Sequence, residues 1–272
     1  MKTPIRYCAG ISWYRLPGIL AKEAQVNNKM VCIMLMLFSF QGMAQHLVLQ
    51  GSVTYERKEN LHKMFDGDED NSWAEAMKKT LPKHRIDFFT LTFNTQRSVY
   101  QLTQEHEGMG ATNFWRVAYR NTVQVDFDQK TIADEKNVYE RDYLITDSLP
   151  QVTWKLTGEY REIAGYNCRK ASTIIMDSVY VIAFYTDAIP VSGGPELFNG
   201  LPGMIMGVVV PRMNITFFAT KVETQLPDPK VFAVKPGKKS KVVKFAQYKE
   251  ELLKDIKNWG KDNMKIFWKA ML

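Results

Sequence analysis

Cysteine is scarce in this sequence, with 3 among 272 residues. Cys8 and Cys32 lie near the N-terminus, and Cys168 is the only one in the body of the chain. Small secreted domains that depend on disulfides carry many cysteines at regular spacings. A disulfide framework is therefore excluded, and stability must come from a hydrophobic core, for which the 45% hydrophobic content suffices.

Long apolar runs are also absent. The longest, residues 30–40, follows Lys29 and is shorter than the roughly 20 residues of a membrane-spanning helix. Gly42 and Ala44 follow it, as the small residues of a signal-peptidase site do. The sequence thus predicts a secretory signal peptide cleaved after Ala44, and a periplasmic or secreted protein without a stable membrane span in its mature chain.

Residues 1–29 precede this run, which is more than a signal peptide usually has before its apolar region. Two interpretations stay open: a start codon placed upstream of the true one, or an N-terminal arm of a cytosolic protein whose first core element is the run. Because Cys32 lies inside the run and no cysteine follows it closely, lipid attachment is not expected.

A strong charge of one sign is missing from the mature chain. The formal net charge of the full sequence is +7, and removal of residues 1–44 lowers it to +3. That segment holds five basic residues and one acidic residue: Lys2, Arg6, Arg15, Lys22, Lys29 and Glu23. Much of the remaining excess lies in residues 235–244, which predicts a solvated basic segment and no nucleic-acid partner.

Motifs for catalysis, cofactors and metals are lacking as well. The sequence has no P-loop, no G-x-S-x-G and no dinucleotide glycine pattern. Its four histidines lack a metal-binding spacing; they are His46, His62, His84 and His106. The acidic stretch 66–71 is similar to the start of a calcium loop, but Asn71 and Met77 stand where an EF-hand needs Gly and Glu. We expect a solvated loop there, and no metal and no cofactor.

The chain is rich in alternating apolar and polar residues, with many Val, Ile, Thr and aromatic side chains, the pattern of half-buried strands. It predicts a first strand over about 47–57 and a short helix over about 73–80, ended by Pro82. Further strands are predicted within residues 86–103, 114–122, 122–128, 130–146, 152–175, 178–189, 201–210 and 214–224. We therefore expect a mainly β fold: an antiparallel meander sheet, for which a half-barrel is one arrangement, with few helices.

The end of the chain has helical spacing instead. Apolar residues recur on one helical face and predict a C-terminal amphipathic helix: Phe245, Tyr248, Leu252, Ile256 and Trp259. Residues 224–244 predict a loose connection before it. The expected organisation is a presegment and signal peptide over 1–44, a β-rich domain over 45–224, and a basic linker with a helical tail over 225–272.

The sequence GLPG at residues 200–203 predicts a tight turn. Pro202 presets φ for the second position of a β-turn, and Gly203 accepts the positive φ of the third, so a type II turn is expected. Residues 204–210 are apolar on both alternating faces. They predict a strand covered on both sides, between a sheet core and a lid or ligand cavity.

Two motifs carry a resemblance to a known family. Residues 158–175, GEYREIAGYNCRKASTII, contain I-x-G-Y-x-C-x-K-A, and residues 183–206, AFYTDAIPVSGGPELFNGLPGMIM, contain I-P-x-x-x-G-P-x-x-F-x-G-L-P-G. In these motifs the chain resembles the GLPGLI family of exported Bacteroidetes proteins, over roughly residues 53–223. Met204 stands where the family has Leu, a nearly volume-conserving exchange, and residues 176–180 lack a glycine often found there. The resemblance implies secretion and a β-rich fold, and it supplies no established activity.

The motif residues are the candidate binding residues: Gly165, Tyr166, Cys168, Pro190, Gly194, Pro195, Phe198, Gly200, Leu201, Pro202, Gly203, Met204 and Met206. Among them only Cys168 offers a nucleophile, and the neighbouring Arg169 and Lys170 would favour its thiolate. No histidine is near it in sequence, and the burial preference of cysteine favours a structural role.

Aromatic residues on the predicted strands either fill the core, as most do, or line a cavity for an apolar ligand; they are Trp115, Tyr119, Tyr139, Tyr143, Trp154, Phe184, Tyr185, Phe217 and Phe218. Together these observations predict an exported binding or carrier-type protein of the cell envelope that holds an apolar ligand or an envelope protein partner. The alternative is a hydrolase or thiol enzyme in which Cys168 works with a distant His84 or His106.

Overall fold

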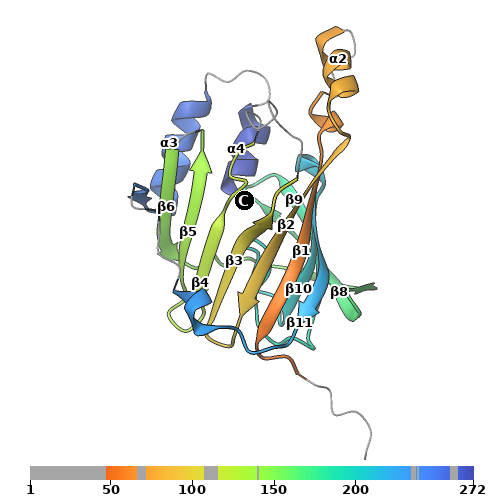
Figure 1. Cartoon of the computed structure of the whole chain (residues 1–272), viewed down its shortest axis with the longest axis vertical. Coiled ribbons are helices and arrows are strands. Elements are labelled where there is room, and N and C mark those ends of the chain that lie inside the picture. The colour runs from red at the N-terminus through yellow and green to blue at the C-terminus, as the bar shows by residue number, and fades with distance from the viewer. Residues whose placement is uncertain are drawn as a thin grey trace, which may run out of the picture. The chain divides into compact units, whose positions relative to one another are not determined.

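A sheet of 12 strands organises the part of the chain that the computed structural model describes (Figure 1). That part comprises residues 47–65, 72–106, 116–139, 141–233, 237, 239–257 and 263–272, all within the unit Leu47–Leu272. The predicted signal peptide, the acidic stretch 66–71, Trp115 and Trp259 lie outside the described residues.

The strand order across the sheet is β12-β6-β5-β4-β3-β2-β1-β11-β10-β9-β8-β7. The strands are β1 Gly51–Asn60, β2 His84–Phe93, β3 Arg97–Gln104, β4 Thr122–Asp126, β5 Thr131–Val138, β6 Arg141–Ser148, β7 Lys155–Ile163, β8 Tyr166–Ile175, β9 Val179–Thr186, β10 Met204–Val210, β11 Ile215–Glu223 and β12 Lys241–Val243. Neighbouring strands are antiparallel except β12, which pairs in parallel with β6. The sheet is not closed, and the predicted mainly antiparallel β fold is confirmed.

Two meanders build this sheet. Strands β1 to β6 form one and β7 to β11 form the other, and they join where β1 pairs antiparallel with β11. Every second residue of β1 is buried, including Tyr55, Arg57 and Glu59. The apolar residues of this face follow the period-two alternation that predicts a strand. Arg57 and Glu59 lie on the same face, so charged side chains are buried there as well.

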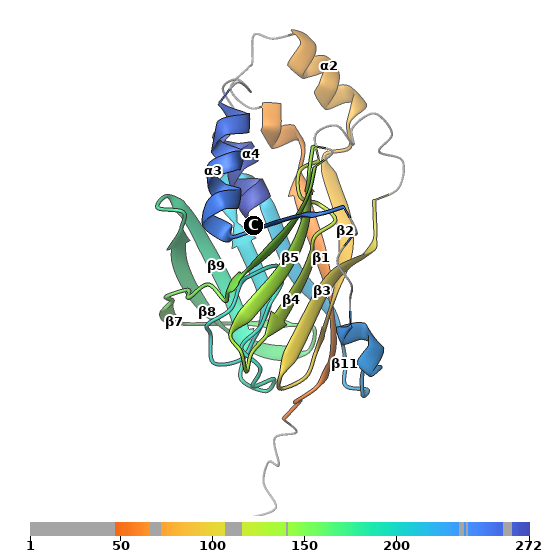
Figure 2. The same cartoon turned by 90° about the vertical axis from the view of Figure 1, so that its left-hand side faces the viewer.

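Helices cover the inner side of the bent sheet. Figure 2 shows α3, Phe245–Ile256, and α4, Asn263–Met271, between strands β7 to β9 on one side and strands β2 to β5 on the other. Tyr248, Leu252 and Ile256 of α3 are buried in one cluster with residues of β6, β9, β10 and β11. The predicted apolar face of the tail is therefore confirmed, although the described tail forms two helices instead of one.

The remaining helical elements are short. The helix predicted near the start is α2, Ser72–Thr80, and it lies beyond the ends of β1 and β2 (Figure 1). Three 3₁₀ turns complete the described elements: η1 His62–Phe65, η3 Pro211–Met213 and η4 Pro229–Phe232. No helix among the described residues has the length and apolar character needed to cross a membrane.

Three sequence predictions need correction. Residues 116–121 form no strand, because the chain bends there with Ala118 at a φ of 46° before β4 begins. The first strand starts at Gly51 instead of Leu47, since the Val48 N–H donates to Ala188 O outside the ladder, at 3.0 Å. Residues 224–244 are not a loose connection throughout, because they contain η4 and β12.

Candidate functional site

The loop between β9 and β10 carries most of the predicted binding residues. This motif loop, residues 187–203, folds back onto the start of β10: the Met204 N–H donates to Ile189 O at 2.9 Å, and the Ile205 N–H donates to Gly193 O at 2.8 Å. Its apolar side chains are buried: Ile189, Val191, Phe198 and Leu201. The loop is therefore part of the core, and its sequence is constrained by packing as well as by turn geometry.

The GLPG turn differs from the expected type. The Gly203 N–H donates to Leu201 O at 2.8 Å, which closes a three-residue turn around Pro202, and the hydrogen bond of a type II turn is not formed. Gly203 has a φ of 153°, and a Cβ on it would overlap the carbonyl oxygen of Thr186 on the neighbouring strand. Glycine is required here mainly because two backbones approach closely.

The strand after this turn agrees with the prediction. Residues Met204–Val210 form β10 between β9 and β11, and all but one of them are buried. Ile205 and Val208 pack in the cluster that contains α3 and α4, whereas Met204 and Met206 pack in a second cluster with residues of β1 to β5. Both faces are thus covered by protein side chains.

The predicted binding residues fall into three places. Gly165, Tyr166 and Cys168 lie on the β7–β8 hairpin, and Cys168 packs in the same cluster as Met204 and Met206. Met204 and Met206 lie on β10. The other predicted residues lie on the motif loop: Pro190, Gly194, Pro195, Phe198, Gly200, Leu201, Pro202 and Gly203. Among all of these residues, Phe198 is the one that lines the apolar groove described below.

Cys168 is in no position to act as a nucleophile. It is completely buried, and its thiol donates to the carbonyl oxygen of Tyr166 at 3.4 Å. Burial raises the pKa of this thiol to about 12, so the thiolate is not populated at neutral pH. The structure gives Cys168 the role of a packed core residue.

Glu196 of the motif loop is the residue that the sequence analysis missed. It is 3% exposed and adopts a left-handed backbone with a φ of 52°. Its Oε1 lies 3.8 Å from Arg57 Nη1, and its Oε2 accepts a hydrogen bond from Asn121 Nδ2 at 2.9 Å. A signal existed in the sequence, because Glu196 is the only charged residue between Asp187 and Arg212.

Further polar side chains are buried on the same inner face. Tyr100 of β3 pairs with Val123 of β4, and Val123 pairs in turn with Asp134 of β5, so the three residues lie in one row across the sheet. Asp134 and Lys136 are completely buried, with Lys136 Nζ 3.3 Å from Asp134 Oδ2. Asp134 and Lys136 alternate with period two along β5 together with the apolar Ile132 and Val138, and this pattern predicts that all four side chains are buried.

The cluster around Glu196 contains buried atoms with no hydrogen bond in the described structure: Arg57 Nη1, Tyr100 OH, Asn121 Oδ1, both carboxylate oxygens of Asp134, Lys136 Nζ and Glu196 Oε1. Burial raises the pKa of Asp134 to about 6. The positive charge of Lys136 opposes this rise, and the negative charge of Glu196 adds to it. Burial also raises the pKa of Tyr100, with Glu196 as the next cause. The charges in this cluster are closely coupled, and Glu196 connects them to the motif loop.

A chain of ion pairs fixes α4 to the sheet. Lys269 of α4 and Arg85 of β2 both form short ion pairs with the buried Glu59 of β1. Burial alone would raise the pKa of Glu59. The positive charges of Lys269, Arg85 and Arg57 instead lower it to about 2. The guanidinium of Arg212 also stacks over the Trp268 ring, 4.3 Å from its centroid. The C-terminal helix is therefore anchored by specific charge contacts.

An apolar groove of about 440 Å³ opens beside the motif loop. It is lined by residues 150–153, by residues 173–176 at the end of β8, by Leu197 and Phe198, and by Phe245 and residues 271–272. Ile174 is 64% exposed at this groove. None of the described aromatic residues proposed from the sequence to line a cavity lines it, and several of them, such as Tyr185 and Phe217, are buried in the core.

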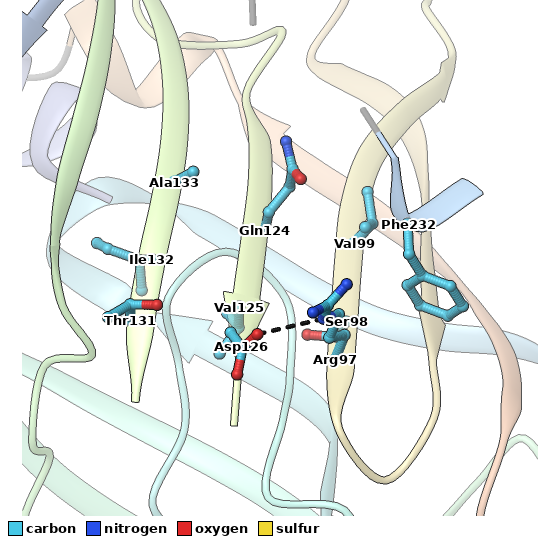
Figure 3. Close-up of a pocket in the computed structure, with 10 residues that line it drawn as sticks. All are labelled: Arg97, Ser98, Val99, Gln124, Val125, Asp126, Thr131, Ile132, Ala133 and Phe232. Atoms are coloured by element: carbon cyan, nitrogen blue, oxygen red, sulfur yellow. Dashed lines mark hydrogen bonds and ion pairs between the residues drawn. The ribbon is translucent and has the colours of Figure 1, made fainter. Parts of the chain in front are cut away.

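A second, smaller groove of about 190 Å³ lies over β3, β4 and β5. Figure 3 shows Phe232 of η4 beside Val99, and Arg97 directed at Asp126, with their Nε and Oδ2 atoms 3.2 Å apart. Val99 pairs with Gln124, next to the Tyr100–Val123 pair, so this row faces the opposite side of the sheet from the buried polar cluster. The lining of this groove shares no residue with the motif loop.

Metal ligands are not gathered in the described part of the chain, where no group of three or more His, Cys, Asp or Glu side chains has a suitable arrangement. His62 contacts the carbonyl oxygen of Leu81 at 2.9 Å. The ring of His106 accepts from the Ile86 N–H at 3.4 Å. These contacts give the two histidines local structural partners near the ends of β1, β2 and β3.

Comparisons with known proteins add a family motif and a distant likeness of fold. A family model described as a protein of unknown function (Porph_ging) matches residues 174–207, which include the end of β8, β9 and the motif loop. A comparison with curated proteins gives no match.

Solved structures are similar only at a distance. Two crystal forms of PNGF-II have 18% and 16% identity and TM-scores of 0.44 and 0.45, over 81% and 82% of this chain. This chain covers only 33% and 34% of those two chains. An uncharacterized conserved protein from Thermus thermophilus has 8% identity and a TM-score of 0.37, over 76% of this chain and 99% of that one. Such values carry no inference about function.

Proposed function

We propose that this protein is an exported binding protein of the cell envelope that holds an apolar ligand or an apolar segment of a partner in the groove beside the motif loop. The observation that carries this proposal is the groove of about 440 Å³ to which Leu197 and Phe198 contribute directly. It links the most distinctive part of the sequence to a surface able to receive a ligand.

The dimensions and chemistry of the groove support binding. Ligand pockets commonly have volumes of roughly 300–1,000 Å³ and mainly apolar linings with a few polar groups. Here the apolar side chains include Ile174, Leu197, Phe198 and Phe245, whereas Thr153 and Thr173 supply the polar groups. An exposed residue such as Ile174 gains free energy when a ligand removes its surface from water.

The competing interpretation is a thiol enzyme or hydrolase using Cys168. It has little physical support, because the thiol is buried and burial raises its pKa to about 12. The binding interpretation requires no activated nucleophile, and Ile174 at the groove is 64% exposed.

Export and membership of the GLPGLI family belong to the same proposal. The match at residues 174–207 covers the second motif on which the resemblance rests, and the N-terminal sequence has the features of a signal peptide. Mass spectrometry of the protein from its own host tests export. A mature N-terminus at Gln45 supports it, and an intact Met1 or Met30 terminus recovered from the cell envelope contradicts it.

The binding proposal is tested with N-phenyl-1-naphthylamine, a dye whose fluorescence rises in apolar sites. Ile174 and Tyr180 are cross-strand neighbours on β8 and β9 and are both exposed, but only Ile174 lines the groove. We expect the dye to bind the wild-type protein, Ile174→Asp to weaken binding at least tenfold, and Tyr180→Asp to leave it within twofold. Equal effects of the two substitutions on dye binding would refute the groove as the site.

A further inference from the structure

We propose that the occupant of the groove is an extended polypeptide segment of a partner protein, which adds as a strand to the free edge of β8 at Ile174. This rests on the proposed function, since it assigns a class of partner to the same groove.

Strand β8 is longer than the strand that covers its outer edge. β7 begins at Lys155, which is paired with Ser172, whereas β8 continues to Ile175. On its other side, β8 stays paired with β9 through the end of the strand, as far as the pair Ile175 and Val179. In the described structure, residues 173–175 therefore have a strand on one side only.

The backbone of Ile174 faces the uncovered side. The carbonyl oxygen of Lys170 accepts a hydrogen bond from Thr157 Oγ1 of β7 at 3.2 Å, so this carbonyl points toward β7. Backbone groups of a strand return to the same side at every second residue. The N–H and C=O of Ile174 thus point to the side on which β7 is absent, at the groove.

Residues 150–153 form the opposite wall, and they are tied to the motif loop instead of to the backbone of β8. Asn199 Nδ2 donates to Pro150 O at 3.1 Å, and Trp154 Nε1 donates to Asn199 O at 2.7 Å. The wall contacts β8 through a side chain, with Thr173 Oγ1 donating to Thr153 O at 2.7 Å. No backbone–backbone hydrogen bond joins residues 150–153 to β8 in the described structure. An added strand would have to break the hydrogen bond between Thr173 and Thr153, but it would displace no backbone ladder.

A polypeptide satisfies both features of this site. A strand added to a sheet edge gains affinity from main-chain hydrogen bonds, and pockets for alternate side chains give it specificity. The edge at Ile174 offers one donor and one acceptor, and Leu197, Phe198 and Leu272 offer an apolar surface to side chains on one face of the segment. An acyl chain would use the apolar surface but would leave the donor and the acceptor of Ile174 without a partner.

The probes are a library of blocked nonapeptides with Val, Ile, Leu, Tyr or Thr at every second position, and palmitate as the acyl chain. Peptides retained by the protein are identified by affinity-selection mass spectrometry, and the tightest is resynthesised with N-methyl groups on alternate amides. We expect the unmodified peptide to bind, N-methylation of its pairing edge to weaken binding at least tenfold, and hydrogen exchange of the Ile174 amide to slow at least tenfold in the complex.

Protein variants separate the backbone from the side chain. Ile174→Pro removes the N–H at a free edge, where proline is tolerated, and Ile174→Ala removes only the side chain. We expect Ile174→Pro to weaken peptide binding more than Ile174→Ala, and Tyr180→Ala to leave it unchanged. If Ile174→Pro fails to fold, the N-methylated peptide and the exchange of the wild-type Ile174 amide still decide the question.

The outcomes separate the two proposals. Binding of palmitate in the groove, with no peptide retained, overturns the polypeptide inference and leaves the proposed function standing. Equal binding of the normal and N-methylated peptides also overturns it, because the backbone edge is then not used. Failure of the dye, of palmitate and of every peptide to bind overturns both proposals.

Discussion

Glu196 of the motif loop forms a buried ion pair with Arg57 of the first strand, with Oε1 and Nη1 3.8 Å apart. Asn121 donates to the other carboxylate oxygen, so Glu196 connects the loop to both β1 and the start of β4. The next two residues, Leu197 and Phe198, line the apolar groove. One short segment thus joins the buried polar cluster to the proposed binding surface.

Removal of Glu196 should therefore be costly. Glu196→Ala removes the carboxylate that pairs with the buried Arg57, and breaking a buried pair in this way costs roughly 3–5 kcal/mol. Replacement of both partners, Arg57→Met with Glu196→Leu, should recover most of this loss. Urea unfolding of the three variants checks both expectations, and a loss below about 1 kcal/mol for Glu196→Ala alone would show that the pair is unimportant.

Gly203 should tolerate no side chain. Gly203→Ala places a methyl group against the carbonyl oxygen of Thr186, and the predicted loss is about 1 kcal/mol or more. Gly158→Ala is the matched control, because a Cβ at Gly158 meets no atom within 4 Å. We expect the control to be neutral or slightly stabilising. Thermal unfolding that shows equal stability of the two variants would contradict the close approach of the two backbones.

The pH dependence of stability should have two opposing parts. Glu59 has its pKa lowered from 4.5 to about 2, so it stabilises the fold above pH 4.5, and this contribution is lost as pH falls toward 2. Asp134 has its pKa raised from 3.8 to about 6, so the folded state binds its proton more tightly. The protonated Asp134 therefore contributes its full stabilisation below pH 3.8, and this contribution is lost as pH rises through 6.

Asp134→Asn isolates the second part. The variant should lose the decline of stability between about pH 4 and 6, while the acid loss below pH 4.5 persists. The exposed Asp128→Asn should keep the wild-type profile. Urea midpoints measured from about pH 3 to 7 give the answer, and identical profiles for wild type and Asp134→Asn would rule out the assigned role of Asp134.

Cys168 should react only when the protein unfolds. Because the thiol is buried and burial raises its pKa, a maleimide should label it slowly in the native state and rapidly in urea. Cys168→Ala should cost about 1 kcal/mol or more through lost packing and leave dye binding unchanged. Rapid native labelling at neutral pH would instead favour the thiol-enzyme interpretation.

Features that depend on residues close together in the sequence were predictable, and features that depend on contacts between distant residues were not. Period-two alternation identified most strands, and the uninterrupted apolar residues of Met204–Val210 identified a strand covered on both faces. The pairing of β1 with β11 was not predictable, because it depends on contacts between distant parts of the chain. The turn at Pro202 was predicted in place but not in type, since Gly203 responds to the neighbouring Thr186 backbone.

The groove was the hardest feature to predict. Residues 150–153, Ile174, Leu197 and Leu272 have no common sequence pattern, and only the bent sheet brings them together. Glu196 was detectable as an isolated charge in an apolar stretch, but its partners Arg57 and Asn121 were not. Most of the motif residues predicted to bind lie on the loop beside the groove, and Phe198 is the one among them that lines it.

The most direct measurement is a methyl NMR titration of the protein with N-phenyl-1-naphthylamine. We predict that the shifts gather at methyl groups of the groove, on Ile174, Leu197 and Leu272, and that the exposed methyl groups of Leu226 and Val242 stay unchanged. Shifts of equal size at Leu226 and Val242, or saturation of the dye without shifts at Ile174 and Leu197, would contradict the assignment of this groove as the binding site.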